Sequence, residues 1–217
     1  KSIEGVSLPH VFTVRNVNDI AKLDQYVSRE EIRNVVVIGG GNTAMDTARA
    51  AKRNAGVEKV SLVYRRTRRY MPADEEELVM AVEDGVEFAE LLAPVKLENG
   101  VLYCKKMVLG DMDASGRRGV VETDETVEVP ADTVIAAVGE KVPGAFYESF
   151  GIALDSRRRP QVNQETLETS VKGVYVAGDG LYGPATVVEG IRDGKMAAEA
   201  IIGKALAEDL FKLSDAE

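Results

Sequence analysis

Residues 34–91 alternate between short apolar runs and longer stretches with a helical period. The run at residues 35–38 is unbroken, which is typical of a parallel strand buried on both faces. Small residues recur on one side of the stretch that follows it, so that helix can lie close to a sheet. The pattern predicts β-α-β-α-β, the half-unit of a doubly wound parallel sheet, and an α/β fold class. The predicted strands are residues 35–38, 60–64 and 86–91, and the predicted helices are residues 43–53 and 74–84.

A different pattern follows the third predicted strand. The dipeptide Asn99-Gly100 lies between two apolar runs, which is a strong hairpin signal. We therefore expect an antiparallel β-meander inserted after the third parallel strand. Its predicted strands are residues 94–98 and 101–109, with one or two more in residues 119–129 after a polar loop. Residues 133–138 then predict a further apolar strand.

The two ends of the chain carry weaker patterns. Residues 1–30 contain one short helical pattern that Asn18 can cap, so we interpret them as a linker. Towards the other end, residues 173–177 predict a strand, and Pro184 opens a long predicted helix. One face of that helix carries Val187, Ile191, Gly194, Ala198 and Ile201. These patterns divide the chain into residues 1–30, 31–140 and 141–217.

The first predicted strand runs into a glycine-rich turn, GGGNTA, at residues 39–44. Between a buried strand and a helix, this spacing fits the dinucleotide-binding fingerprint, in which Gly39 permits the tight turn and Gly41 lets the backbone approach a pyrophosphate. Ala44 takes the third glycine position, and the phosphates would lie on the amides of the following helix. The alternative is a glycine-rich turn that binds nothing. The candidate cofactor-binding residues here are Gly39, Gly40, Gly41, Asn42 and Thr43.

Four arginines follow the second predicted strand, in the segment YRRTRR at residues 64–69. A site for NAD would place an acidic residue there to accept from the ribose 2′-hydroxyl. A guanidinium is instead a permanently charged planar fork that suits a 2′-phosphate. We therefore predict NADPH over NADH, with Arg65 and Arg66 as the first candidates. The alternative is a solvated basic loop, or ion pairs with the acidic run at residues 74–77.

A second candidate site follows the strand predicted at residues 173–177, which ends in Gly178-Asp179. A carboxylate there can accept from sugar hydroxyls, and the N-terminus of the next helix can face partial negative charge. A turn with a capping aspartate fits the same residues equally well. The residues alone therefore leave both interpretations open.

Composition narrows the class of protein. The 217 residues are 45% hydrophobic and carry a formal charge of −9, which argues against a nucleic-acid or anionic-membrane surface. No stretch approaches the roughly 18 consecutive apolar residues of a membrane span. One cysteine, Cys104, and one histidine, His10, provide no disulfide, Cys-x-x-Cys pair, metal cage or iron–sulfur cluster within this sequence. We expect a reducing, cytoplasmic setting and a buried, structural Cys104.

Taken together, these segments resemble a known family: the small subunit of NADPH-dependent glutamate synthase and its relatives, flavoproteins with two dinucleotide-binding domains. The relatives include the N-terminal half of dihydropyrimidine dehydrogenase and selenate-reductase-type oxidoreductases. The matching segments span nearly all of residues 34–202. They are VVVIGGGNTAMD, VYRRTRRYMPA with the acidic helix after it, MVLGDMDASGRRG, ADTVIAAVGEKVP and GVYVAGDGLYGPATVVEGIRDGKMAAEAI.

The resemblance implies a Rossmann-like FAD/NAD(P)-binding fold, a parallel sheet with helices plus an antiparallel β-meander. Residues 31–140 would be the NAD(P)H-binding domain, and residues 141–217 the C-terminal portion of a second, FAD-binding domain. Residues 1–30 would be a linker or part of the FAD domain. The chain does not begin with Met, and we expect it to be a piece of a longer protein or to lack its first residue.

The resemblance also implies roles for residues outside the glycine turn. Asp179, after Gly178, would bind the ribityl chain of the flavin. The amides of Thr186 and Val187 would face the pyrimidine edge of its ring, and Gly139 would lie at the crossing between domains. The sequence departs from the family pattern at Asn42, where many members carry Asp, and at Glu140, where many carry Gln.

The implied function is electron input. Hydride would pass from NADPH to FAD, and electrons would leave for iron–sulfur centres outside this chain through an electron-acceptor domain or subunit. The cofactors carry this chemistry, so we expect neither a catalytic side chain nor a bound metal. The family's FAD domain begins with its own glycine fingerprint, which lies upstream of the NADPH domain, and this sequence has none before the one at residues 39–44. We therefore expect the chain alone not to hold FAD firmly.

Two other functions fit parts of the sequence. One is a thioredoxin-reductase-like pyridine nucleotide-disulfide oxidoreductase, against which the absence of a Cys-x-x-Cys pair counts. The other is a dinucleotide-binding sensor without turnover. Reduction of a dye by NADPH in the full-length protein would separate an oxidoreductase from a sensor.

Overall fold

The computed structural model describes residues 3–14, 17–27, 31–112, 118–139 and 141–203. The chain divides into two compact units, residues 1–139 and 140–217, and each unit is described by itself. The elements of the first unit are β1 (Val11–Thr13), α1 (Val17–Val27), β2 (Asn34–Ile38), α2 (Asn42–Lys52), β3 (Lys59–Tyr64), the 3-10 turn η1 (Arg68–Tyr70), α3 (Glu75–Glu83), β4 (Glu87–Glu90), β5 (Leu92–Glu98), β6 (Val101–Met112), β7 (Arg118–Pro130) and β8 (Thr133–Ala136).

A five-stranded sheet forms the centre of the first unit, with strand order β1-β8-β2-β3-β4 and parallel pairing throughout. Val36 in β2 lies opposite Ser61 in β3 and Val134 in β8. Because parallel strands end at the same edge, the turn after β2 and the arginine segment after β3 emerge side by side. The predicted β-α-β-α-β unit is confirmed, and each of its strands and helices begins and ends within one residue of the predicted position.

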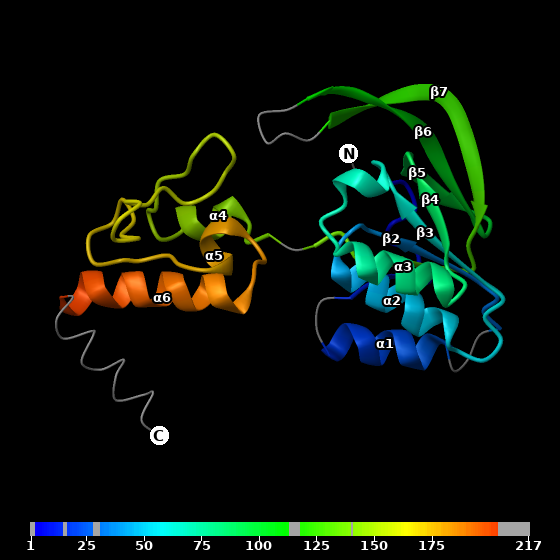
Figure 1. The fold of residues 1–217 in the computed structure, drawn as a ribbon, viewed down its shortest axis with the longest axis horizontal. Coiled ribbons are helices and arrows are strands. Elements are labelled where there is room, and N and C mark those ends of the chain that lie inside the picture. Colours follow the sequence, from blue (N-terminus) through cyan, green and yellow to red (C-terminus); the bar gives the residue numbers. More distant parts are fainter. Residues whose placement is uncertain (1–2, 15–16, 28–30, 113–117, 140, 204–217) are drawn as a thin grey trace. The chain divides into compact units, whose positions relative to one another are not determined.

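Helices cover one face of this sheet (Figure 1). Alternate residues of the buried strands, such as Val35 and Leu62, pack against Ala44, Met45 and Ala48 of α2. Each of these three α2 residues is fully buried. The small side chains bring the helix axis close to the sheet, as the spacing of alanines predicts.

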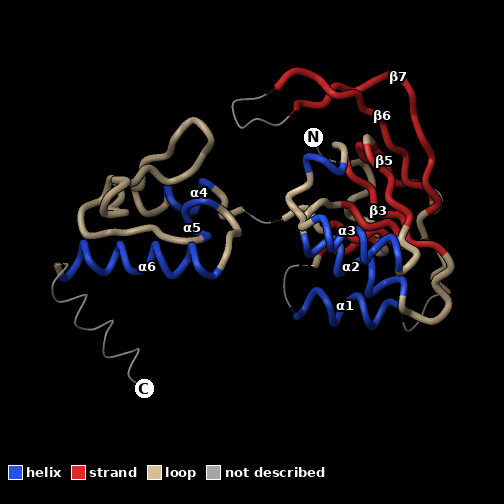
Figure 2. Tube along the Cα trace, viewed as in Figure 1, coloured by secondary structure: helices blue, strands red, loops and turns tan. Residues whose placement is uncertain are grey.

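The other face of the sheet is covered by strands (Figure 2). Val36 and Val134 pack there against Leu102 and Cys104 of the antiparallel sheet β5-β6-β7. The first unit therefore has three layers: helices, parallel sheet and meander. The hairpin turn lies at Asn99 and Gly100, with φ values of 50° and 73°, as the sequence predicts.

The sequence predicts no strand in residues 1–30, but the structure contains β1, paired with β8 at the sheet edge. Three residues are too few for a hydrophobic period to be read. Val11 lies opposite Val134, so the partner that makes the segment a strand is distant in sequence. The helix predicted nearby is present as α1.

The second unit contains α4 (Gly144–Glu148), α5 (Asp179–Tyr182) and α6 (Val187–Ile202). The strand predicted at residues 173–177 is wrong: within the described part of the chain, this segment has a single bridge, from Tyr175 to Glu168. An apolar run becomes a strand only when neighbouring strands accept its hydrogen bonds. The predicted long helix is present but begins at Val187 rather than at Pro184. The tail beyond Leu213 lies outside the described residues.

Candidate functional site

The glycine turn connects β2 to α2. Gly41 is the N-cap residue of α2 and has an extended backbone, with φ −100° and ψ 173°. A Cβ on Gly39 would lie 2.4 Å from the carbonyl oxygen of Ala137, and a Cβ on Gly40 would lie 2.4 Å from the ring of Tyr64. Both glycines are therefore required by close packing inside the protein.

Gly41 differs, because a Cβ added there would meet nothing within 4 Å. The first backbone bond of α2 runs from the Ala44 N–H to the Gly41 carbonyl, at 2.9 Å. Among the described residues, nothing accepts from the N–H groups of Asn42 and Thr43, and both residues are exposed. Free amides at the positive end of a helix, beside open space, fit a pyrophosphate group.

The arginine segment lies beyond the end of β3. The Arg65 side chain is exposed and has no interaction with any described residue. The Arg66 Nε donates to the Arg118 carbonyl at 3.2 Å, and Arg68 forms an ion pair with Glu75 at 2.5 Å. Ion pairing with the acidic run therefore accounts for Arg68, whereas Arg65 keeps its whole guanidinium available for a ligand.

The chain between the arginines and α3 is fastened to the glycine turn. The Ala73 N–H donates to the Gly40 carbonyl at 3.0 Å. The Asn42 Nδ2 donates to the Asp74 Oδ2 at 3.0 Å, and the Asp74 N–H donates to the Asn42 Oδ1 at the same distance. Sequence reasoning missed the contact of Asp74 with Asn42. Asp74 stands just before an acidic helix, and that position indicates only a helix-capping residue.

Charged side chains also join α2 to α3. The Arg49 Nε donates to the Asp84 Oδ2 at 2.8 Å, and a second guanidinium nitrogen lies 3.6 Å from Glu77. The hydrogen bond from Arg49 lowers the pKa of Asp84 below its ordinary value. This contact fixes the two helices that carry the glycine turn and Asp74.

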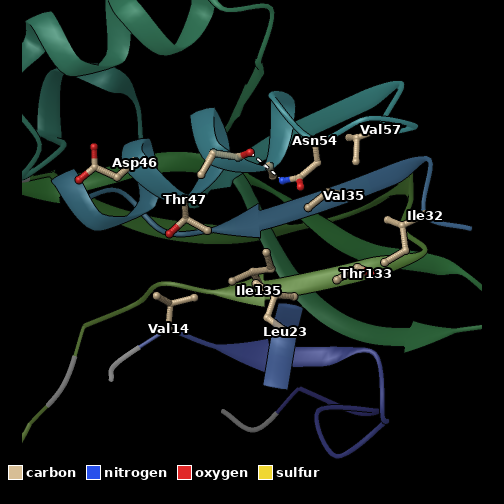
Figure 3. A pocket seen from close by; sticks show the side chains of 12 residues that line it. Val14, Leu23, Ile32, Val35, Asp46, Thr47, Asn54, Val57, Thr133 and Ile135 are labelled. Carbon is tan, nitrogen blue, oxygen red and sulfur yellow. Dashed lines mark hydrogen bonds between the residues drawn. The ribbon is translucent and has the colours of Figure 1, made fainter. Parts of the chain in front are cut away.

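A separate cavity of about 280 Å³ lies between α1, α2 and the sheet (Figure 3). Its wall is mainly apolar, with Leu23, Val35 and Ile135 among its lining residues. The hydroxyl of Thr133 is buried there without a hydrogen-bond partner among the described residues. The described residues that line the cavity include none from the glycine turn, so it is not the predicted nucleotide site.

The remaining chemical groups of the first unit are few. Cys104 is fully buried, and burial raises the pKa of its thiol to about 12, which confirms the predicted structural thiol. Gly139 has a φ of 80°, which favours glycine. Within the described ranges, no three His, Cys, Asp or Glu side chains are grouped as a metal site requires. None of the described helices has the length and apolarity to cross a membrane.

In the second unit, Gly178 and Asp179 form a tight turn. Gly178 has a φ of 56°, and its N–H donates to the Asp193 Oδ2 at 3.1 Å. Asp193 is 2% exposed and also pairs with Arg192 at 2.8 Å. The Asp179 Oδ1 accepts from the Ala185 N–H at 3.1 Å. Sequence reasoning missed Asp193, because an acid within a helix is ordinarily solvated.

The N-terminus of α6 is closed by a capping box. The Thr186 hydroxyl accepts from the Glu189 N–H at 3.3 Å, and the Thr186 N–H donates to the Glu189 carboxylate at 2.9 Å. Hydrogen bonds from Thr186 lower the pKa of Glu189, and the bond from the Thr186 backbone N–H contributes most. The Thr186 amide is thus engaged within the protein, whereas the Val187 N–H has no acceptor among the described residues.

Comparison with known proteins identifies the family. A family model described as pyridine nucleotide-disulphide oxidoreductase matches residues 2–194. The chain belongs to this family. The match runs from the start of the first unit into α6, and so includes the glycine turn, the arginine segment and the Gly178 turn.

Individual relatives agree with this family. The oxidoreductase YgfK of Escherichia coli (strain K12) is 42% identical over 173 residues, which cover 79% of this chain and 17% of that protein. The NADPH glutamate synthase small chain of the same strain is 37% identical over 216 residues, or 92% of this chain and 45% of that one. The resemblance to glutamate synthase small subunits is confirmed. The chain spans less than half the length of either relative.

A solved structure agrees with the fold. FprA from Mycobacterium tuberculosis superposes with a TM-score of 0.70 at 19% identity, over 96% of this chain and 62% of that one. The predicted fold class, a parallel sheet with helices and an antiparallel meander, is confirmed.

Proposed function

We propose that this chain is the NADPH-binding electron-input module of a flavin oxidoreductase. It would receive hydride from NADPH onto FAD and send electrons on to iron–sulfur centres outside the chain, in an electron-acceptor domain or subunit. One observation carries the proposal: the free amides of Asn42 and Thr43 lie at the same sheet edge as the free guanidinium of Arg65. The glutamate synthase relatives, whose names include NADPH, support it.

The residues of the first unit would bind and orient the nucleotide. The pyrophosphate would lie on the amides of α2, in the open space over Gly41, because the helix dipole favours negative charge there. Arg65 would pair with the 2′-phosphate through its planar fork. When both cofactors are bound, NADPH supplies the hydride that the flavin accepts. We assign residues 31–140 to this nucleotide domain.

The second unit would contribute to the FAD site. Gly178 and Asp179 would face the flavin's ribityl chain, with one oxygen of Asp179 already held by the Ala185 amide. The Val187 amide is free to donate, whereas the Thr186 amide would first have to release Glu189. We therefore assign residues 141–217 to part of a FAD domain, residues 1–30 to a linker or part of it, and Gly139 to the crossing. A cytoplasmic setting is part of the proposal, supported by the single cysteine.

Nucleotide titration of the 217-residue chain tests the proposal. We expect Arg65→Ala to weaken NADPH binding by about tenfold, the scale of one charge-assisted hydrogen bond, and to leave NADH binding within about twofold. Gly41→Ala should weaken both nucleotides alike, because its methyl group occupies the space of the pyrophosphate they share. Isothermal titration calorimetry provides the dissociation constants of both nucleotides for the unmodified chain and each variant.

Arg157→Ala is the matched control, because Arg157 is an exposed arginine of the second unit. It should bind both nucleotides as the unmodified chain does. Arg66→Ala should have a smaller effect than Arg65→Ala, because part of its guanidinium is held by Arg118. Equal losses of NADPH and NADH in Arg65→Ala would contradict the assignment of the 2′-phosphate.

A further inference from the structure

The arginine segment, residues 65–69, belongs to a loop that is fastened at both ends. At its start, the Leu91 N–H donates to the Arg66 carbonyl, and the Arg66 Nε donates to the Arg118 carbonyl, each at 3.2 Å. At its end, the Tyr64 hydroxyl donates to the Tyr70 carbonyl at 2.9 Å. The last fastening is the reciprocal pair of hydrogen bonds between Asn42 and Asp74.

We propose that the Asn42–Asp74 pair sets the nucleotide specificity of the site by holding the arginine segment in place beside the glycine turn. Neither side chain need touch the 2′-phosphate, so both are positioning residues. The inference rests on the proposed function, because it concerns how the same site selects NADPH. It assigns to the Asn42 side chain a role in addition to the proposed binding of phosphate by the Asn42 backbone amide.

Asn42 can serve both parts of the site because its backbone and side chain have different partners. The backbone N–H is free at the first turn of α2, where a phosphate would bind. The side-chain amide instead faces Asp74, to which it donates one hydrogen bond and from whose N–H it accepts another. An asparagine provides both a donor and an acceptor. An aspartate at position 42 would oppose the Asp74 carboxylate with like charge.

Asp74 is committed to this contact rather than to its own helix. It occupies the N-cap position of α3, yet its side chain makes no capping hydrogen bond. The carboxylate Oδ2 binds Asn42 instead, and the neighbouring Ala73 N–H reaches Gly40. Asp74 therefore connects the end of the loop to the glycine turn instead of capping α3.

The pair matters for specificity because of what lies between the two fastened ends. Arg69 lies between these ends, and Arg65 directly precedes the first of them. Both side chains are exposed and neither forms a hydrogen bond or ion pair with a described residue, so only the loop backbone positions their charges. The Arg68 N–H also donates to the Glu90 Oε2 at 2.9 Å, so releasing the end at Asp74 loosens mainly the stretch beyond Arg68 and spreads the Arg69 guanidinium over many positions. That change weakens the binding of a nucleotide with a 2′-phosphate. It leaves unchanged the pyrophosphate contacts, which NADH and NADPH share.

The first experiment compares the NADH to NADPH ratio of dissociation constants in the full chain. We expect Asn42→Asp and Asp74→Ala each to lower this ratio by about tenfold, the scale of one charge-assisted hydrogen bond. The double variant Asn42→Asp with Asp74→Asn restores one donor, one acceptor and the original net charge. Its ratio should return to within about twofold of the unmodified chain.

The second experiment needs no nucleotide. Trypsin cleaves after arginine, and the loop contains four potential cleavage sites. Asn42→Asp and Asp74→Ala should raise the rate of cleavage within residues 65–69 by about tenfold through local opening, and the double variant should reverse this. Asn163→Asp is the matched control, since it adds the same charge at an exposed position of the second unit and keeps the Oδ1 that accepts from the Glu165 N–H; it should change neither the cleavage rate nor the ratio.

The outcomes separate this inference from the function on which it rests. If the unmodified chain binds NADPH no better than NADH, the proposed function is wrong and the specificity role falls with it. If the unmodified chain prefers NADPH but Asp74→Ala keeps both the ratio and the slow cleavage, only the Asn42–Asp74 inference is overturned. A double variant that fails to restore the ratio while remaining folded also overturns it.

Discussion

Each glycine of the turn at residues 39–41 is required for a different reason. Gly39 is required by the Ala137 carbonyl and Gly40 by the Tyr64 ring, whereas a side chain on Gly41 would meet no protein atom. From spacing alone, the fingerprint predicts a tight turn at Gly39 and a close approach of a ligand at Gly41, but not the contact of Gly39 with the Ala137 carbonyl, which belongs to a segment distant in sequence. The role of Gly40 depends on a ring from the next strand, and only the packed structure reveals it.

The fully buried thiol of Cys104 leads to a prediction about pH. Burial raises its pKa from 9.0 to about 12, so the folded state favours the protonated form. Its contribution to stability is complete below pH 9 and is lost as the pH rises towards 12, because the unfolded thiol ionises first. Between about pH 8 and about pH 10, the unfolding free energy should fall by about 1.4 kcal/mol more in the unmodified chain than in Cys104→Ala.

Denaturant unfolding at the two pH values measures this difference. Cys104→Ala also removes packed atoms, so its stability is lower at both values, but that loss is independent of pH. The comparison therefore uses the change with pH and not the absolute free energy. An identical change in the two proteins would show that the thiol ionises as readily in the folded state as in the unfolded state.

At the scale of elements, the capping box determines where α6 begins. Thr186 and Glu189 satisfy one another's backbone N–H groups, which is a strong helix start. Thr186→Ala should lower the unfolding free energy of the second unit by about 1 kcal/mol, as measured by denaturant titration followed by circular dichroism.

Thr186→Ser keeps the hydroxyl and is the control for that experiment. The pKa of Glu189 is lowered in the folded state, so its contribution is present above its ordinary value of 4.5 and is lost as the pH falls below it. The difference between Thr186→Ala and the unmodified chain should therefore shrink in acid. Thr186→Ala removes the bond from the Thr186 hydroxyl to the Glu189 carboxylate, at 2.8 Å, but keeps the bond from the backbone N–H. A difference that is constant with pH would show that the hydroxyl does not hold Glu189.

Two elements show why local patterns fail. The run at residues 173–177 has strand-like composition, but among the described residues only Tyr175 finds a bridging partner. Conversely, β1 has almost no local signal and is a strand because β8 pairs with it. Strand formation depends on partners that are distant in sequence, whereas the helical period of α2 is contained in the helix itself.

At the scale of the whole molecule, the two units differ in how complete a proposed cofactor site each contains. The first has a parallel sheet, a glycine turn and free amides. The second has the Gly178 turn and a capped helix. Its segment GDGLYG at residues 178–183 has the glycine spacing of the fingerprint, but within the described residues it follows no strand and leads only into the short helix α5. We therefore predict that the purified chain binds NADPH but carries FAD well below one equivalent.

Flavin absorbance after denaturation, relative to protein concentration, measures the FAD content. The chain should be purified both with and without added FAD, because loss during purification would otherwise mimic weak binding. One equivalent of FAD retained after gel filtration would contradict the prediction. It would show that the second unit holds the flavin without the upstream fingerprint of the family's FAD domain.

The sequence by itself determined the central architecture and the position of the glycine turn. Those features depend on short-range patterns, since the strand, the GGGNTA turn and the alanine-lined helix are contiguous in residues 34–52. Tertiary structure decided three features. The first is which arginines are free and which are paired, and the second is the pairing of Asp74 with Asn42. The third is that the Thr186 N–H donates to Glu189 within its own chain. The first two depend on residues brought together from separate elements. The third depends on side-chain orientation at a helix end, where an amide can bind either its own chain or a ligand.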